Sequence, residues 1–371
     1  MTGVSKMDRR TFLSVVAAGF GRSLAAPPSA PTLMYVGAFQ DKILIYDETQ
    51  EKVIDQIQTH TGIPRSLTLS QDRKKVFCFT LKHCGIEVVD VVTRKVTSHF
   101  ELDQGNRRVW LRNLAPDPEG KLLYSVITTR IKQIDRFEIE PPKFAVIDVE
   151  QQKIVKTVDY PKEGAAVHRL GATTRLSPDG KYLYIFRENV LIFDTTDFKL
   201  VETIELSKPA WPGMETVNIG PGDDPNDEPG IVTAVFNSTD PVVHHRIFGI
   251  ARVDLAKRTF DFTPVGPATT GMQGLRLTPD RKTGYTVAFH DNLGNRRSEF
   301  LVFDMATRKL ANKAEFPGPT NFRFTLSANG KEIYIYGSAP VMDLYDAATL
   351  KLKKSIDVGA DLTTGLLAVP A

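Results

Sequence analysis

The chain has few cysteines and lacks the short motifs that mark several kinds of cofactor-dependent catalysis. Its 371 residues include two cysteines, and neither stands in the Cys-x-x-Cys-His run that attaches a c-type haem. A His-Glu-x-x-His zinc motif, a phosphate-binding loop, a Gly-x-Ser-x-Gly elbow and a nicotinamide fingerprint are also absent. We therefore expect no cofactor and no metal in this chain, and the motifs leave open whether it is an enzyme.

No apolar run is long enough for a membrane helix, and this includes the run near the N-terminus. There Asp8-Arg9-Arg10-Thr11-Phe12-Leu13 forms a twin-arginine motif, a weakly apolar run ends at Phe20, and Ser23-Leu24-Ala25 is a small-x-small cleavage site. The pattern predicts a twin-arginine signal peptide over residues 1–25, a short linker over residues 26–32 and a periplasmic protein. The alternative is a chance pair of arginines in a disordered tail.

Outside residues 1–25 the chain has no excess of positive or negative charge. The whole chain has a formal net charge of +3. Residues 1–25 hold the cationic Lys6, Arg9, Arg10 and Arg22 against the anionic Asp8, which is also a charge of +3. The remainder is neutral (3 − 3 = 0), so nothing in its charge indicates nucleic-acid binding.

The chain does contain a repeated β pattern, which is most complete in residues 177–206. A Ser-Pro-Asp-Gly-Lys turn is followed by three short runs rich in β-branched and aromatic residues, which end at Phe186, Asp194 and Ile204. The turn needs a residue with positive φ, and Gly180 supplies it at no steric cost. Short β-rich runs separated by turn residues predict an antiparallel meander.

The pattern recurs seven times, and each time an aspartate before a turn ends the third strand. A repeat of 42 to 60 residues with four short strands predicts the blade of a β-propeller. We interpret the aspartates as turn formers and not as catalytic acids or metal ligands, because their carboxylates can accept nearby backbone N–H groups. They are Asp47, Asp90, Asp148, Asp194, Asp254, Asp304 and Asp346.

The two ends of the repeat array predict how the ring closes. With the strands of a blade lettered A to D from the centre outward, the array begins on a B strand at Leu33–Val36 and ends on an A strand at Gly365–Val369. The closing blade then combines the C-terminal strand A with the N-terminal strands B to D, which leaves no free edge between the ends. The predicted fold is all-β, a single seven-bladed β-propeller over residues 33–371.

Loop lengths predict which face of the propeller is functional. In a meander the B–C and D–A connections share one face, and the long B–C loops are expected at Thr128–Lys143, Asn237–Ile247 and His290–Ser298. A converging set of basic and aromatic residues is typical of an interface, with a solvated rim of loops as the alternative. The candidate interface or ligand residues on this face are Arg107, Arg108, Trp110, Arg130, Lys132, Asp135, Arg136, His168, Arg169, Trp211, His244, His245, His290, Arg296 and Arg297.

Three smaller features each have two explanations. Cys78 and Cys84 could form a disulfide after export, although a tight turn at residues 82–83 would place Cys78 opposite Glu87. The pair His244-His245 could share a metal only from a loop, because adjacent strand residues point to opposite faces. The acidic run 222–228 is interpreted as a solvated turn, since it lacks the continuation of an EF-hand calcium loop.

The segment Thr128–Val146 carries a resemblance to a known family. It combines Arg130, an Asp near the aromatic Phe137, and the step Pro141-Pro142-Lys143 before strand C. In these features it resembles the third blade of the β subunit of quinohaemoprotein amine dehydrogenases. The C-terminal run 343–364 is similar too, and the remaining likeness is the shared pattern of YVTN-type propellers.

This resemblance implies an exported subunit of an amine-dehydrogenase-like complex that has no redox cofactor of its own. In that family the haem and the quinone belong to partners, a cytochrome c-type subunit and a small quinone-bearing subunit. One alternative is a stand-alone YVTN-type propeller that binds a protein or a cell-surface ligand. Another is a lactonase-like hydrolase, since Tyr35-Val36-Gly37 resembles the opening of lactonase propellers.

A charged contact between Arg130 and Asp135 is also expected in the Thr128–Lys143 loop. Pro141 and Pro142 stiffen the return of this loop into strand C. A rigid loop with several charged groups is typical of a docking surface, so the contact is expected to order the loop or to meet a partner.

Overall fold

The protein is described here from a computed structural model that covers residues 32–81, 84–111, 114–161, 173–186, 189–206, 217–220, 224–239, 242, 244–292, 294–319 and 321–369. The predicted signal peptide, and the linker up to residue 31, lie outside these ranges. The described residues form β-strands and no helix, which confirms the predicted all-β class. None of these residues belongs to a helix that could span a membrane.

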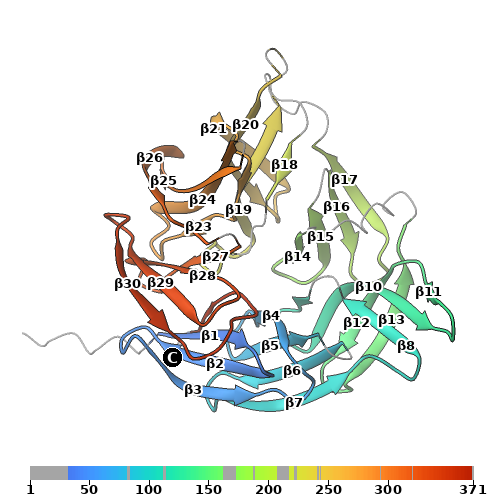
Figure 1. Ribbon diagram of the computed structural model, residues 1–371. Coiled ribbons are helices and arrows are strands. Elements are labelled where there is room, and N and C mark those ends of the chain that lie inside the picture. Colours follow the sequence, from blue (N-terminus) through green and yellow to red (C-terminus); the bar gives the residue numbers. More distant parts are fainter. Residues whose placement is uncertain are drawn as a thin grey trace, which may run out of the picture. The chain divides into compact units, whose positions relative to one another are not determined.

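The strands form seven small antiparallel sheets, the blades of a seven-bladed propeller (Figure 1). Blade 1 contains β31 (Leu367–Val369), β1 (Leu33–Ala38), β2 (Lys42–Asp47) and β3 (Lys52–Gln58). Blade 2 contains β4 (Pro64–Leu69), β5 (Lys75–Thr80), β6 (Gly85–Asp90) and β7 (Lys95–Glu101). Blade 3 contains β8 (Arg107–Leu111), β9 (Ala115–Pro116), β10 (Leu122–Lys132), β11 (Phe137–Ile139), β12 (Lys143–Asp148) and β13 (Lys153–Asp159).

Blades 4 to 7 follow in chain order and complete the ring. Blade 4 contains β14 (Thr173–Leu176), β15 (Tyr182–Phe186), β16 (Asn189–Asp194) and β17 (Leu200–Glu205), and blade 5 contains β18 (Asn218–Ile219), β19 (Ile231–Thr239), β20 (Arg246–Asp254) and β21 (Thr259–Pro267). Blade 6 contains β22 (Gly271–Met272), β23 (Arg276–Leu277), β24 (Thr283–Asn292), β25 (Asn295–Asp304) and β26 (Lys309–Phe316). Blade 7 contains β27 (Arg323–Leu326), β28 (Glu332–Tyr336), β29 (Val341–Asp346) and β30 (Leu352–Asp357).

The hydrophobic core lies between neighbouring blades. The buried residues of the described chain form seven clusters, and each cluster joins two adjacent sheets of the ring. Strands B and C are apolar on both sides because each inner sheet packs against a neighbour on either face, which explains runs such as Tyr182–Phe186 in place of a strict alternation.

The predicted closure of the ring is confirmed. Strand β1 pairs antiparallel with β31, and Leu33 lies opposite Val369. The Gly37 N–H donates a hydrogen bond of 2.8 Å to Oγ1 of Thr364, just before β31. The last strand begins at Leu367, two residues later than the predicted start at Gly365.

The repeated aspartates form turns, as the sequence predicted. Each carboxylate accepts a backbone N–H two or three residues further along, at 2.6 to 2.9 Å. At Asp90 the hydrogen bond from the Thr93 N–H lowers the pKa of the carboxyl group. The Gly180 turn also has the predicted positive φ, at 72°.

The cysteine and acidic-run interpretations have different outcomes. Both cysteines are buried free thiols, and Cys78 lies opposite Glu87, as the tight turn required. The described part of the acidic run forms a turn, as predicted, with Pro225 and Glu228 exposed, but it is not solvated throughout. The Asp224 carboxylate is buried and accepts the Leu277 N–H of blade 6 at 3.0 Å, so it joins blades 5 and 6.

A half-buried glutamate joins the two blades at which the ring closes. The Glu48 carboxylate, in the turn after β2, accepts the Ala328 N–H of blade 7 at 3.1 and 3.2 Å. Burial raises the pKa of Glu48 to about 7, and these hydrogen bonds only partly oppose the shift. The folded protein therefore holds this carboxylate in its charged form at a cost.

Replacing Glu48 by Gln removes this ionisation and keeps an acceptor for the Ala328 N–H. The pKa of Glu48 is about 7 in the folded state and 4.5 in the unfolded state, so the folded state favours the protonated carboxyl group. The contribution of Glu48 to the free energy of unfolding is therefore fully present below pH 4.5 and is lost as the pH rises through about 7. Parent and Glu48→Gln should have similar Tm at about pH 4, and the variant should be more stable at about pH 8, by up to about 3 kcal/mol.

Thermal unfolding at both pH values measures this difference. Glu150→Gln is the matched control, because Glu150 is exposed in the corresponding turn of blade 3. A Tm difference for Glu48→Gln that does not change between the two pH values would contradict the assignment.

Candidate functional site

The predicted B–C loops are for the most part strand. In blade 3 strand β10 continues to Lys132, and the short strand β11 pairs back onto it over Phe137–Ile139. In blade 6 strands B and C extend in the same way, to the pair Asn292 and Asn295, whereas in blade 5 the pairing of strands B and C ends at Thr239 and Arg246. The prediction of a loop over Thr128–Lys143 was therefore wrong, because its β-branched and aromatic residues alternate with charged ones and favour strand pairing.

The structure divides the candidate residues among three blades. Those on or beside the β10–β11 hairpin of blade 3 are Arg107, Arg108, Trp110, Arg130, Lys132, Asp135 and Arg136. His290, Arg296 and Arg297 lie on the β24–β25 hairpin of blade 6, and His244 and His245 precede β20 in blade 5. His168, Arg169 and Trp211 lie outside the described residues.

Two arginines flank the Trp110 ring near the base of the blade 3 hairpin. The guanidinium carbon of Arg65, from β4 of blade 2, lies 4.5 Å from the ring centroid, and that of Arg130 lies 5.0 Å away. Cation–π contacts of this kind contribute about 0.5–1 kcal/mol each at exposed sites. Nη1 of Arg65 and Nε1 of Trp110 are buried with no hydrogen-bond partner among the described residues, an arrangement that costs stability.

The two faces of the blade 3 hairpin carry different side chains. Arg130 lies opposite Ile139, and Lys132 lies opposite Phe137. Opposite residues of antiparallel strands share a face, so these four side chains lie on one side, with Trp110 against Arg130. We call Trp110, Arg130, Lys132, Phe137 and Ile139 the basic–apolar face.

Ion pairs occupy the remaining charged groups of the hairpin. Arg107 pairs with Glu140 at 3.0 Å, and Arg136 bridges Asp135 at 3.1 Å and Glu138 at 3.0 Å. The predicted contact between Arg130 and Asp135 was therefore wrong. The reason is the strand register, which places Arg130 opposite Ile139 and leaves Asp135 in the turn beside Arg136.

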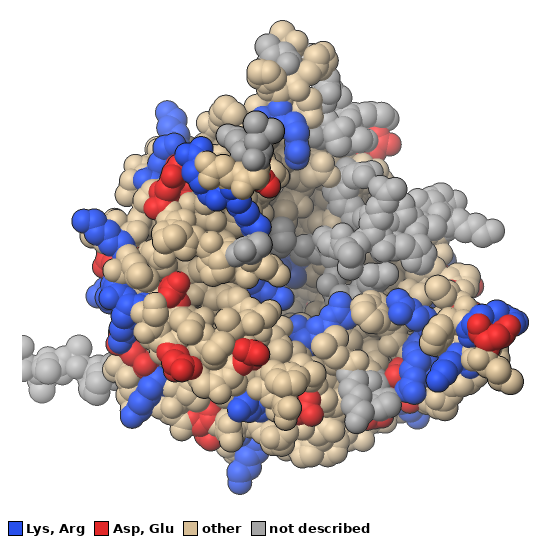
Figure 2. All heavy atoms as spheres, viewed as in Figure 1, with Lys and Arg blue, Asp and Glu red and all other residues tan. Residues whose placement is uncertain are grey.

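The basic–apolar face exposes groups that are normally buried or paired. The Phe137 side chain is 59% exposed and Ile139 is 65% exposed, and Ile134 at the turn is fully exposed. Neither Arg130 nor Lys132 has a carboxylate partner among the described residues. Figure 2 shows charged side chains of both signs gathered over β11, with basic ones nearer the central hollow.

The candidate residues predicted from the sequence include the two cations and Trp110 of this face but not Phe137 or Ile139. The signal was present, because Phe137 and Ile139 alternate with the acidic Glu138 and Glu140 and so fall on the opposite side of a strand. It was overlooked because the segment was assigned to a loop. Arg65 was missed because it lies in the preceding blade.

The blade 6 hairpin offers a second, more neutral surface. Its described basic groups have partners: His290 contacts Glu299 at 3.0 Å, and Arg297 pairs with Glu315 at 2.8 Å. Arg296 lies over the Phe289 ring at 4.6 Å. A hollow of about 470 Å³ lies beside Arg296, Arg297 and Phe316.

Comparison with known proteins supports the fold and no finer class. No protein-family model and no curated protein matches this chain. Among solved structures, hydrazine synthase of Kuenenia stuttgartiensis is similar at 15% identity, over 83% of this chain and 95% of that one, with a TM-score of 0.52.

Two further structures are similar to the same degree. Apo AztD from Citrobacter koseri has 11% identity over 92% of this chain and 98% of its own, with a TM-score of 0.53. The dihydro-haem d1 dehydrogenase NirN in complex with DHE has 14% identity over 93% of this chain and 78% of its own, with a TM-score of 0.53. At these identities the likeness shows the fold alone, so the chain is assigned here as a seven-bladed β-propeller.

The stack at Trp110 gives a testable prediction. Arg130→Ala removes one of the two cation–π contacts, so it should lower the free energy of unfolding by about 0.5–1 kcal/mol. It should also increase quenching of Trp110 fluorescence by acrylamide, measured in a Trp211→Phe background because the chain has 2 tryptophans.

Lys132→Ala is the control, since Lys132 lies on the same face as Arg130 and two residues further along β10 from the position of the ring. Equal quenching and equal denaturant midpoints for Arg130→Ala and Lys132→Ala would show that the stack contributes nothing.

Proposed function

We propose that this protein is a non-catalytic propeller subunit that holds an acidic partner protein on the basic–apolar face of blade 3. The observation that carries the proposal is the exposure of Phe137 and Ile139 beside Arg130 and Lys132. Aromatic and arginine side chains are enriched in interface hot spots. A partner that buries the two apolar side chains would remove them from water, which is favourable in proportion to the area covered.

The hairpin is already ordered for such contact. Strand β11 is paired to β10 over three residue pairs, and Arg107 and Arg136 form ion pairs with neighbouring carboxylates of the hairpin. A preorganised surface loses little conformational freedom on binding, so more of the contact energy appears as affinity.

Charge indicates the kind of partner. Arg130 and Lys132 have no carboxylate partner within the part of the chain that the structure describes, so the matching surface should carry acidic groups around an apolar centre. Complementary charges of this kind speed encounter and fix the orientation of the complex.

We propose further that the complex is an exported, amine-dehydrogenase-like redox assembly in the periplasm. In this proposal the chain binds no cofactor, and a cytochrome c-type partner and a small quinone-bearing partner carry the redox groups. The support is the twin-arginine motif and the resemblance of the Thr128–Val146 segment, which includes the hairpin itself.

Replacing both Phe137 and Ile139 by Ser should release the partner. Tagged protein purified natively from its source should carry a c-type haem absorption band, and the double variant should lose it, because affinity falls tenfold for about every 1.4 kcal/mol of lost contact. The haem band relative to protein absorbance is the measurement.

The matched control replaces Val341 and Leu352 by Ser, since these are also exposed apolar residues but lie on blade 7. It should leave the haem band unchanged. Wild-type protein without a haem-bearing companion, or a double variant that retains it, would contradict the proposal.

Export gives a separate prediction. Replacing Arg9 and Arg10 by Lys should leave the precursor in the cytoplasm, because the twin-arginine route reads this pair and carries folded cargo. Fractionation followed by immunoblotting measures the distribution. Continued appearance of the mature form in the periplasm would contradict the assignment of the signal.

A further inference from the structure

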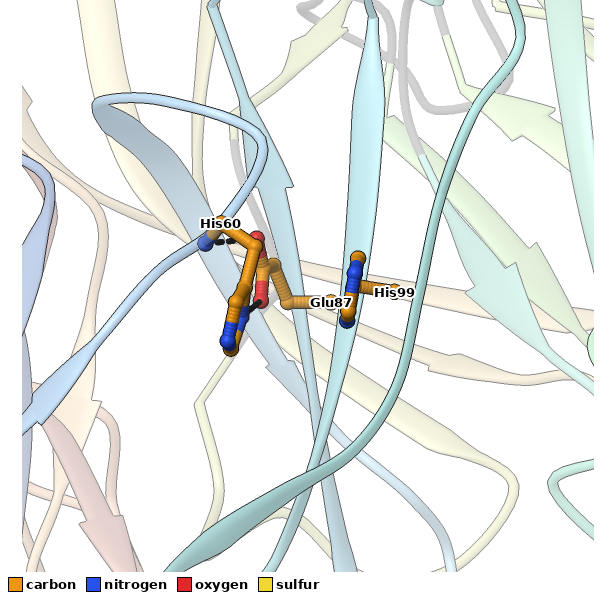
Figure 3. Close-up of side chains that lie close together, drawn as sticks. All are labelled: His60, Glu87 and His99. Atoms are coloured by element: carbon orange, nitrogen blue, oxygen red, sulfur yellow. Dashed lines mark hydrogen bonds and ion pairs between the residues drawn. The ribbon is translucent and has the colours of Figure 1, made fainter.

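Three side chains with metal-binding atoms meet beside blade 2. His60 lies in the connection after β3, Glu87 in the middle of β6, and His99 on β7 (Figure 3). Their imidazole nitrogens and carboxylate oxygen lie within 4.8 Å of one another. These histidines differ from His244 and His245, the pair that the sequence offers for a metal.

The Glu87 carboxylate is fixed in place. It is fully buried, and its Oε1 accepts the His60 N–H and the Thr61 N–H, each at 2.6 Å, and the Thr61 hydroxyl at 2.8 Å. Thr61 packs closely against Gly85, where an added Cβ would lie 2.2 Å from the Thr61 Cβ. The second oxygen, Oε2, lies 3.2 Å from His60 Nδ1.

A purely structural role explains only part of this arrangement. The hydrogen bonds to Oε1 hold the connection between blades 1 and 2 against β6. The buried carboxylate is sufficient for this role without either imidazole ring. These hydrogen bonds do not account for His99, which lies directly across from Glu87 and whose ring has no hydrogen-bond partner among the described residues. The His99 ring instead stacks on His60, with centroids 4.2 Å apart and planes 8° from parallel.

We propose that His60, Glu87 and His99 bind a divalent transition-metal ion of the Zn²⁺ or Cu²⁺ class. Two imidazoles and one carboxylate are a donor set that suits these ions, whereas Ca²⁺ and Mg²⁺ prefer oxygen ligands throughout. The hydrogen bonds to Oε1 orient the carboxylate as second-sphere contacts do in metal sites. Three protein ligands leave a further position for water or for a group from a partner.

The two rings must rearrange slightly to share one ion. Imidazole lone pairs lie in the ring plane, so two parallel stacked rings cannot both point at one atom between them. One ring has to turn about its Cβ–Cγ bond. Both rings are exposed, with 49% of the His60 side chain open to solvent, so this rotation meets little resistance.

The nearby thiol is not part of the donor set. Cys78 lies opposite Glu87 on β5, whereas His99 lies opposite Glu87 on β7. Among the described residues, the metal-binding atoms that lie within 4.8 Å of one another come from His60, Glu87 and His99, and the Cys78 Sγ is not one of them. The ion should therefore have nitrogen and oxygen ligands only.

Isothermal titration of the tag-free full-length chain with Zn²⁺ tests the site. Wild-type protein should bind a single ion, and His60→Ala and His99→Ala should each weaken binding by more than about tenfold. Glu87→Gln, which keeps an acceptor for the Thr61 N–H, should weaken binding by a similar factor. His244→Ala is the control and should bind as wild type does.

Co²⁺ gives an independent readout of the ligands. The Co²⁺ spectrum of the wild type should show ligand-field bands without a thiolate charge-transfer band, and it should be lost in His60→Ala and His99→Ala. Far-ultraviolet circular dichroism of each variant shows whether the propeller is folded. Wild-type protein that binds neither Zn²⁺ nor Cu²⁺, or folded His60→Ala and His99→Ala variants that bind as wild type does, would overturn the proposal.

Discussion

A blade of this protein can bury both of its faces only against its two neighbours. The core is accordingly divided into clusters between blades and has no common centre. A ring left open would expose the apolar faces of its end blades, so the pairing of β1 with β31 supports every other interface. Glu48 adds a polar link across the same closing interface, from blade 1 to blade 7.

This constraint explains why the fold could be predicted from the sequence. The repeated aspartates and the Gly180 turn are local features whose hydrogen bonds and φ are set within a few residues, and the structure places them as expected. The closure followed from strand identity at the two ends, because an incomplete blade at each end can be completed only by the other. The last strand was predicted less accurately, since β31 begins two residues after the predicted start at Gly365.

The candidate site was predicted less well because it depends on contacts between blades and on strand register. The charges of residues 130–136 indicated a docking segment, but only the register of β10 and β11 shows that Arg130 shares a face with Ile139 and not with Asp135. Arg65 reaches Trp110 from another blade, which no local pattern reveals. Glu87 was visible as an acid within an apolar strand, yet its partners His60 and Thr61 lie in a connection 26 to 27 residues away.

The two proposed binding regions use the rigidity of the ring in different ways. The basic–apolar face extends from blade 3 on a paired hairpin, so its apolar side chains are presented to a partner without a folding step. The His60–Glu87–His99 cluster draws on the contact between two neighbouring blades, because the connection after β3 is held against β6. In both cases β-strand pairing positions the side chains.

Site-specific photo-cross-linking tests most directly whether a partner binds the basic–apolar face. A benzophenone side chain introduced in place of Phe137 lies on an exposed strand position and reaches only molecules that contact this face. In the native source, irradiation should join the protein to a haem-bearing chain, whereas the same group in place of Leu352 on blade 7 should not. Cross-linking at Leu352 and not at Phe137, or no adduct at Phe137 while a haem-bearing chain co-purifies, would contradict the account.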